Sequence, residues 1–341
     1  MLQFLSLIGA IALTACCWGV YGPVLHFGRE AMHSSLRPFM CVGLAYFLIA
    51  VLTPLALLAR GGERGAWSAK GVLWSLLAGT AGALGALGVI LALGFGGRPI
   101  YVMPLVFGGA PIVNTLLTAF MNKAFDQLKA PFLAGLILVV LGAVTVLVCK
   151  PQPQAHAAAA AAPAASDPDA DAPVAPPKTM EQKTERFIEV LLATVLSMLS
   201  WGAYGPVLHR GQGAMGGSRL RPLVCIGVAY FLIAVLVPLA LLVPMGDTGS
   251  WDVGGTLWSL GAGALGALGA LGTILAFACG GKPFTVMPVV FGCAPVINTL
   301  ATIALAHTPP AAVSPFFLAG MLIVAVGAAT VLAFGPRGHA T

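Results

Sequence analysis

The chain has 341 residues, of which 59% are hydrophobic and only 8% are charged. A soluble domain carries about 25% charged residues because its surface must be solvated, so this composition excludes an ordinary water-soluble globular protein. The net charge of +6 comes from basic residues scattered between apolar runs, which form no basic patch. A lipid bilayer is therefore the expected partner, and nucleic acid is not.

Apolar stretches close to the length that spans a bilayer follow one another along the chain, five in each half. They lie at residues 2–22, 38–58, 71–95, 99–121 and 131–149, and then at 187–205, 222–242, 255–279, 283–306 and 315–334. We therefore divide the chain into a first five-helix repeat (1–150), a linker (151–185), a second five-helix repeat (186–336) and a short C-terminal tail (337–341). The linker combines an alanine run with scattered proline and aspartate, has no apolar face to bury, and is predicted to be disordered.

The two halves repeat one another. The segment 18–26, Trp-Gly-Val-Tyr-Gly-Pro-Val-Leu-His, returns at 201–209 with one change, and 32 of 48 positions are identical between 71–118 and 255–302. Two repeats that each cross the bilayer an odd number of times face opposite ways. The sequence thus predicts an all-α integral membrane protein of ten transmembrane helices in two inverted five-helix repeats, an architecture found in many secondary transporters.

The charges of the loops between the predicted helices indicate, independently of the repeat, how the chain is oriented in the membrane. The second and fourth loops of the first half carry Lys and Arg, whereas their counterparts in the second half carry none. With the N-terminus inside, the cytoplasmic loops and C-terminus collect ten basic residues, and the short outer loops collect three. The positive-inside rule then places both termini in the cytoplasm and the linker outside. The expected location is a bacterial cytoplasmic (inner) membrane.

Glycine recurs every three residues in the third helix of each repeat. Because no strand precedes these glycines and they lie inside an apolar span, they do not indicate a nucleotide-binding loop. Small residues allow helix backbones to approach closely, so we assign them to helix packing. The glycines are Gly79, Gly82, Gly85 and Gly88, with Gly263, Gly266, Gly269 and Gly272.

Repeated prolines predict helix breaks. Pro23 and Pro206 follow glycine near the end of the first and sixth helices, which should kink or end there, either beside a cavity or as plain termini. Two further prolines lie inside each of the fourth and ninth helices, where a broken helix at the bilayer midplane would indicate a transport site. These are Pro104 and Pro111, with Pro288 and Pro295.

Polar and aromatic residues repeated at equivalent positions are the candidates for substrate binding. The amides need partners in lipid, either another helix or a substrate. The aromatic residues either belong to an interfacial belt or form a cavity wall suited to sugars or bases. The histidines are the only repeated groups that titrate near neutral pH. The candidates are Trp18, Tyr21, His26 and Asn114, with Trp201, Tyr204, His209 and Asn298.

The predicted function is that of a secondary transporter, which moves a small polar or amphipathic organic solute, such as a sugar or nucleobase-like compound, by alternating access. The sequence shows no paired carboxylates, no nucleophile with a base and no metal cluster, so neither an enzyme nor a cofactor or metal site is expected. A coupling ion and facilitated diffusion both remain open. The alternative is a non-transporting membrane scaffold or assembly protein.

The pattern resembles the drug/metabolite transporter superfamily of EamA type. The resemblance is carried by two sets of five helices, a Trp-Gly near the end of the first, glycine-rich third helices and proline-containing fourth helices. The Trp-Gly ending and the long linker loosely resemble the glucose/ribose porter and ureide permease branch. The resemblance implies a central cavity formed by helices one to four and six to nine. It also implies peripheral fifth and tenth helices, where a homodimer would form.

Overall fold

The computed structural model describes residues 2–97, 99–149, 180–305 and 313–336. All regular secondary structure within these ranges is helical, and ten of the spans are long and apolar enough to cross a membrane. The predictions of an all-α fold and of ten helices able to span a membrane are confirmed for the described residues. Linker residues 151–179 and the tail 337–341 lie outside the described residues.

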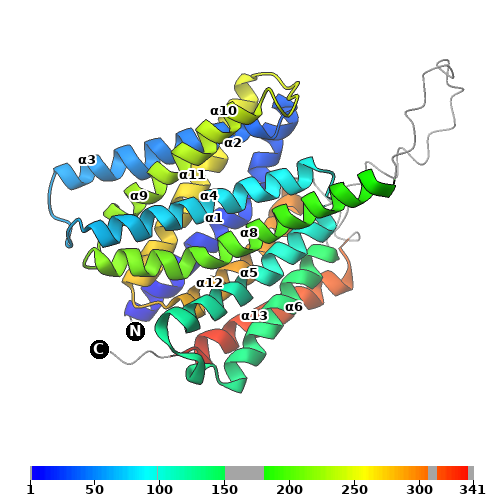
Figure 1. The fold of residues 1–341 in the computed structure, drawn as a ribbon. Helices are drawn as coiled ribbons and strands as arrows, with labels where there is room; N and C mark the ends of the chain where they lie inside the picture. Colours follow the sequence, from blue (N-terminus) through cyan, green and yellow to red (C-terminus); the bar gives the residue numbers. More distant parts are fainter. Residues whose placement is uncertain (1, 98, 150–179, 306–312, 337–341) are drawn as a thin grey trace, which may run out of the picture.

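The helices run roughly side by side in one bundle (Figure 1). The first half contains α1 (Leu2–Met32), α2 (Leu36–Tyr46), η1 (Phe47–Leu52), α3 (Thr53–Ala59), α4 (Ala69–Gly94), α5 (Pro99–Asn122), the short η2 (Phe125–Gln127) and α6 (Ala130–Val148). The second half contains α8 (Met180–Ala214), α9 (Leu220–Phe231), η3 (Leu232–Leu236), α10 (Val237–Leu241), α11 (Val253–Ala278), α12 (Pro283–Leu305) and α13 (Pro315–Phe334).

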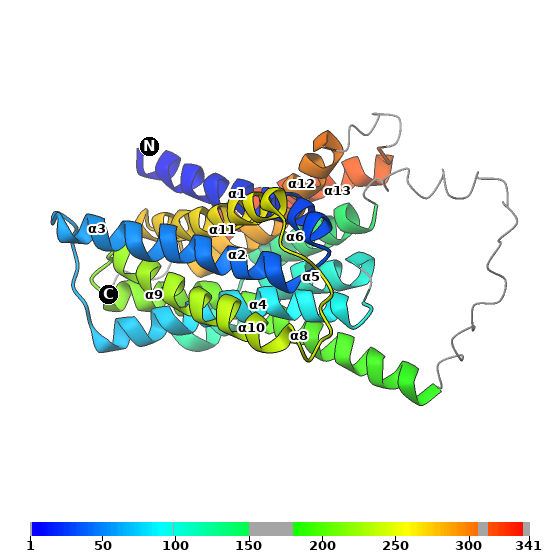
Figure 2. The same cartoon turned by 90° about the horizontal axis from the view of Figure 1, so that it is seen from above.

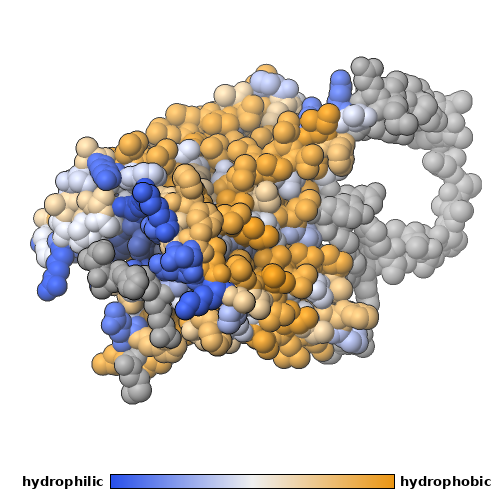
Figure 3. Space-filling view, turned by 60° about the horizontal axis from the view of Figure 1, so that its bottom comes forward, coloured by the Kyte–Doolittle hydropathy of each residue, from blue (hydrophilic) through white to orange (hydrophobic). Residues whose placement is uncertain are grey.

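We call the end of the bundle where α1 begins the N-side, and the end where α1 finishes the far side (Figure 1). On the N-side, Gln3 donates a hydrogen bond to the Cys279 carbonyl, which places the start of α1 beside the end of α11. On the far side, the backbone N–H of Ser250 donates to the Met32 carbonyl. Polar residues gather at the N-side, and a broad apolar surface covers the bundle beside them (Figure 3).

The first and sixth spans do not end at their prolines. Pro23 lies inside α1, which continues to Met32, and Pro206 lies inside α8, which continues to Ala214. Proline at position 23 leaves the Gly19 carbonyl without its usual donor, and Asn298 supplies one at 3.1 Å. A neighbouring helix can therefore support a helix that continues past proline. Helix α8 also begins at Met180, so residues 180–185 are helical rather than disordered.

The fourth and ninth spans are likewise continuous. Pro104 and Pro111 lie inside α5, and Pro288 and Pro295 lie inside α12, so the expected midplane breaks are absent. Irregular turns occur in the second and seventh spans instead, where η1 and η3 are π-helical. Each π segment is followed by a proline within two residues, and π turns are rare insertions that are frequent at functional sites.

Helices from the two sequence halves are interleaved in the packing. Helix α4 packs against α8 and α9, and α5 packs against α8. Correspondingly, α11 packs against α1 and α2, and α12 packs against α1. We call α4, α5, α8 and α9 the α8 group, and α1, α2, α11 and α12 the α1 group. Helices α6 and α13 pack on each other at one edge of the bundle (Figure 2 shows the bundle from above).

The glycine repeat forms these interfaces. A Cβ added at Gly79 would lie 2.7 Å from the Ile226 Cα, and one at Gly263 would lie 2.8 Å from the Val42 Cα. Such distances leave no room for any side chain, so the helices meet backbone to backbone. The remaining glycines of the repeat face aromatic rings or hydroxyl side chains of the same partner helices. Their assignment to helix packing agrees with these contacts.

We predict that Gly85→Ala destabilises the protein. The new Cβ would lie 2.1 Å from Cδ1 of Trp201, whose indole is held by a hydrogen bond and cannot move freely. Overpacking of this kind costs about 1–3 kcal/mol. Thermal unfolding of the purified protein in detergent should show a lower midpoint. Gly9→Ala is the matched control, because nothing lies within 4 Å of the added Cβ. Equal stability of the two variants would contradict the packing of Gly85 on Trp201.

Candidate functional site

Six aromatic residues, three from each sequence half, pack in one hydrophobic core where the α1 group contacts the α8 group. We call Trp18, Tyr21, Tyr46, Trp201, Tyr204 and Tyr230 the central aromatic cluster. The Tyr46 and Tyr230 rings stack with centroids 3.8 Å apart and planes at 4°. Trp18 contacts Tyr204 edge-on at 5.7 Å. Two rings of one group thus contact two rings of the other, so the cluster forms the boundary between the groups.

The glycine repeat positions the cluster. Gly82 and Gly85 of α4 face Tyr230 and Trp201, and Gly266 and Gly269 of α11 face Tyr46 and Trp18. Each indole is also anchored to the glycine helix. Trp18 Nε1–H donates to the Gly266 carbonyl at 3.2 Å, and Trp201 Nε1–H donates to the Gly82 carbonyl at 3.1 Å. With their N–H groups satisfied, the indoles present their rings to the boundary.

The two repeated amides bind backbone carbonyls of the opposite sequence half. Asn114 is fully buried, and its Nδ2–H donates to the Pro283 carbonyl at 2.8 Å. Asn298 is half-buried and donates to the Gly19 carbonyl. In this conformation both amides join helices, and the buried Oδ1 of Asn114 accepts no hydrogen bond from a described residue. The Tyr204 hydroxyl is also buried without such a partner.

The two histidines lie at opposite ends of the bundle, away from the central aromatic cluster. His26 is exposed on the far side and pairs with Glu30, with Nε2 3.1 Å from Oε1. His209 is half-buried near the N-side, and its ring meets Phe277 edge-on at 5.1 Å. The structure thus brings together the predicted Trp and Tyr residues, but it does not place the histidines with them.

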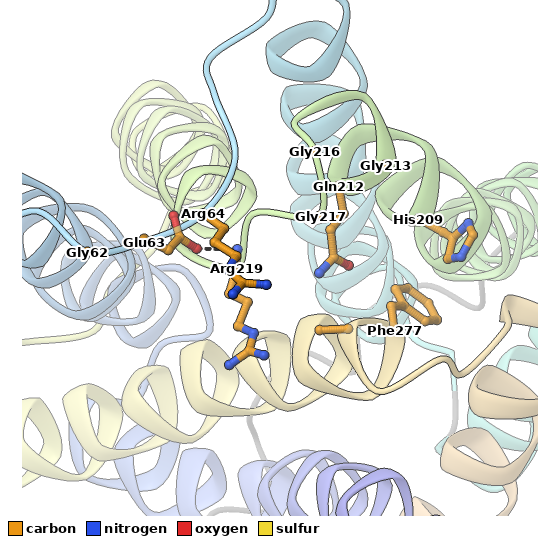
Figure 4. Close-up of a pocket in the computed structure, with 11 residues that line it drawn as sticks. Gly62, Glu63, Arg64, His209, Gln212, Gly213, Gly216, Gly217, Arg219 and Phe277 are labelled. Atoms are coloured by element: carbon orange, nitrogen blue, oxygen red, sulfur yellow. Dashed lines mark hydrogen bonds between the residues drawn. The ribbon is translucent and has the colours of Figure 1, made fainter. Parts of the chain in front are cut away.

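A cavity of ≈ 550 Å³ opens at the N-side (Figure 4). His209, Gln212 and the glycines after them come from α8 and its following turn, Phe277 comes from α11, and Glu63 and Arg64 come from the α3–α4 connection. Gln212 is 4% exposed, and its Nε2–H donates to the Ile274 carbonyl at 3.1 Å. This contact between α8 and α11 lies at the wall of the cavity.

Two equivalent ion pairs fix the connections between helices. On the N-side, Glu63 accepts hydrogen bonds from Ser218 Oγ at 2.8 Å, from Arg221 Nη1 at 2.9 Å and from the first backbone amides of α9. On the far side, Asp247 pairs in the same way with Arg37 and Ser34. Each carboxylate comes from one sequence half and each arginine from the other. The pairs therefore tie the two halves together at both ends of the bundle.

The sequence alone did not identify Tyr46, Tyr230 or Gln212. The two tyrosines recur in the repeated Ala-Tyr-Phe-Leu-Ile-Ala-Val-Leu segment, so the duplication carried a signal for them. The duplication gave no such signal for Gln212, because the equivalent position in the first half is Arg29. Only the packing of α8 against α11 reveals its contact.

Comparison with known proteins supports the fold. The chain is similar to a solved structure described only as "Crystal structure of protein", with 19% identity and a TM-score of 0.62. The match covers 98% of this chain and 99% of the other. No family model and no curated protein matches the chain. The ten-helix arrangement is thus shared over nearly the whole length with an experimentally determined fold, and the function has to be inferred from the site.

We predict that Glu63→Ala lowers thermal stability. The Glu63 side chain is 16% exposed, and its loss removes the acceptor of the Ser218 hydroxyl and of the Arg219 and Leu220 amides. It leaves Arg221 Nη1 with only longer bonds, to the Arg64 carbonyl at 3.4 Å and to Ser218 Oγ at 3.3 Å. Unpartnered buried donors cost about 1–3 kcal/mol. Glu30→Ala is the control, since that side chain is 64% exposed and should leave the unfolding midpoint unchanged. Equal midpoints would show that the ion pair does not stabilise this connection.

Proposed function

We propose that this protein is a secondary transporter of the drug/metabolite transporter type, built from two inverted five-helix repeats that work by alternating access. The observation that carries the proposal is the central aromatic cluster. Equivalent residues of both repeats meet there at the boundary between two groups of helices. A transporter with inverted repeats binds its substrate at such a boundary, near the middle of the membrane.

The chemistry of the cluster favours a neutral solute with a flat or ring-shaped body. Aromatic rings offer stacking surfaces, and tyrosine hydroxyls and asparagine amides offer hydrogen bonds. The six residues of the cluster are uncharged, and the guanidinium of Arg29 on α1 interacts electrostatically with Tyr21. Sugars and nucleobase-like metabolites have this combination of an apolar face and polar edges.

Reconstitution into liposomes tests the proposal. Purified protein should accelerate the uptake or efflux of one or more solutes in a panel of radiolabelled sugars, nucleobases and nucleosides, relative to empty liposomes. Trp18→Ala and Trp201→Ala should abolish that flux, because each removes a ring from the boundary. Absence of flux for every solute in a monodisperse, folded sample would favour the alternative, a membrane scaffold or assembly protein.

We predict that Asn298→Ala weakens binding of the solute identified in that panel by about three- to tenfold, which corresponds to loss of one neutral hydrogen bond. Asn298 is half-buried beside Gly22 of the repeated Trp-Gly-x-Tyr-Gly-Pro segment. Thr302→Val is the matched control one turn along α12, because it loses only a bond to the Asn298 carbonyl. Unchanged affinity with a lower unfolding midpoint would show that the amide serves helix packing alone.

We place the N-side in the cytoplasm of a bacterial cell, with the far side outside the cytoplasmic membrane, because basic residues concentrate in the N-side connections. Single cysteines at Ala66→Cys (N-side) and Met245→Cys (far side), in a background without native cysteines, test this orientation. Both positions are exposed, and neither substitution alters a charge. An impermeant maleimide should label residue 66 only from the cytoplasm and residue 245 only from outside. The reverse pattern would invert the orientation.

A further inference from the structure

Helices of the two repeats contact one another at the N-side, but the equivalent helix pairs at the far side do not make the same contacts. Helix α8 contacts α11 near the N-side, whereas the equivalent pair on the far side, α1 and α4, makes no comparable contact. Helix α12 likewise contacts α8 and α6, while α5 has no comparable contact with α1 or α13. The α1 and α8 groups are therefore closed against each other at the N-side and less so at the far side.

Burial shows the same difference at equivalent positions. At seven equivalent pairs the N-side residue is buried and the far-side residue is half-buried, whereas Leu271 and its equivalent Leu87 show the reverse. The buried residues are Tyr204, Leu208, Gln212, Ile274, Phe277, Met287 and Phe291. Their half-buried equivalents are Tyr21, Leu25, Arg29, Ile90, Leu93, Met103 and Phe107. Most pairs are identical in residue type, so the difference arises from conformation more than from composition.

The side-chain hydrogen bonds from Gln212 and Asn114 join the α1 group to the α8 group on the N-side, and their equivalents on the far side do not. On the N-side, Gln212 of the α8 group donates to Ile274 of the α1 group, and Asn114 donates to Pro283. On the far side, Asn298 bonds Gly19 within its own group. Arg29, the equivalent of Gln212, has no hydrogen bond across the boundary to a described residue. Its Nε is buried without a partner among the described residues, as is the Oε1 of Gln212.

We propose that Gln212 with Ile274, and His209 with Phe277, form a gate at the N-side that is closed in this structure. Arg29 with Ile90, and His26 with Leu93, form the equivalent far-side gate, which is open. This inference rests on the proposed transport function. During the cycle the N-side gate parts, the N-side cavity extends inward past Gln212, and Arg29 closes onto the Ile90 carbonyl.

The difference between Gln212 and Arg29 sets the balance between the two states. Closing the far-side gate must remove the rest of a guanidinium, whose Nε is already buried, from water, whereas closing the N-side gate buries only a neutral amide. Burial of a charge is more costly than burial of an amide that keeps one hydrogen bond. The N-side closed state is consequently favoured in the absence of substrate, which is the state that the structure shows.

Cysteine accessibility tests the gates without any substrate. In the full-length chain lacking native cysteines, Leu25→Cys and Leu208→Cys place probes at equivalent positions one helical turn inside Arg29 and Gln212. An impermeant maleimide is applied to sealed vesicles of each orientation. We expect the cysteine at 25 to react from the far side much faster than the cysteine at 208 reacts from the N-side.

Gate variants should then shift the two rates in opposite directions. Gln212→Ala removes the bond to Ile274, so labelling at 208 should rise about two- to tenfold while labelling at 25 falls, as expected for loss of one neutral hydrogen bond in a two-state equilibrium. Arg29→Gln removes the charge, so the far-side gate should close more readily. As in Gln212→Ala, labelling at 208 should rise and labelling at 25 should fall. Thr194→Val, which loses only a bond within α8, should shift neither.

Each result decides the proposal. Reciprocal shifts support the gates even if no transported solute has been found. Equal labelling at 25 and 208 in the parent protein, or a rise at both positions in Gln212→Ala and Arg29→Gln, would overturn the gates while leaving any measured transport intact. If Gln212→Ala fails to fold, Arg29→Gln alone carries the test, because its side chain bonds no described residue in this state.

Discussion

The close approach of glycine-bearing helices is the constraint on which the rest of the structure depends. Lipid gives apolar helices no hydrophobic reason to associate with each other, so their contact relies on dense van der Waals packing. Glycines on α4 and α11 let partner backbones approach closely, and the space beside them is filled by aromatic rings and hydroxyl side chains. The central aromatic cluster follows from this. Its indoles and phenols occupy the space that the missing side chains leave.

Duplication makes two such interfaces from one pattern, and their differences are as informative as their similarity. The glycine interfaces of α4 and α11 are alike in their contacts, so each behaves as one fixed unit. Differences appear only between the units, where Asn114 is buried and its equivalent Asn298 is half-buried. Identical residues in unlike surroundings are what the proposed alternating access requires, because its boundary would take two packed arrangements.

Local sequence was sufficient for features that depend on composition and spacing. It predicted the ten apolar spans, and it singled out the glycines Gly79 to Gly88, which lie at helix contacts in the structure. It failed where distant residues decide the outcome. Helix α1 continues past Pro23 because Asn298, far away in sequence, provides the donor that the Gly19 carbonyl lacks. Nothing near Gln212 or Glu63 indicates that they meet Ile274 and Arg221, since both contacts form only when the halves interleave.

The interleaving has a consequence for how the protein is made. Helix α4 enters the membrane well before its partners α8 and α9 have been synthesised, and its glycine face then meets only lipid. The first five helices therefore lack, until the second five are made, most of the contacts that α4 and α5 have in the complete chain. The α1 group and the α8 group can each be assembled only when helices of both sequence halves are in place.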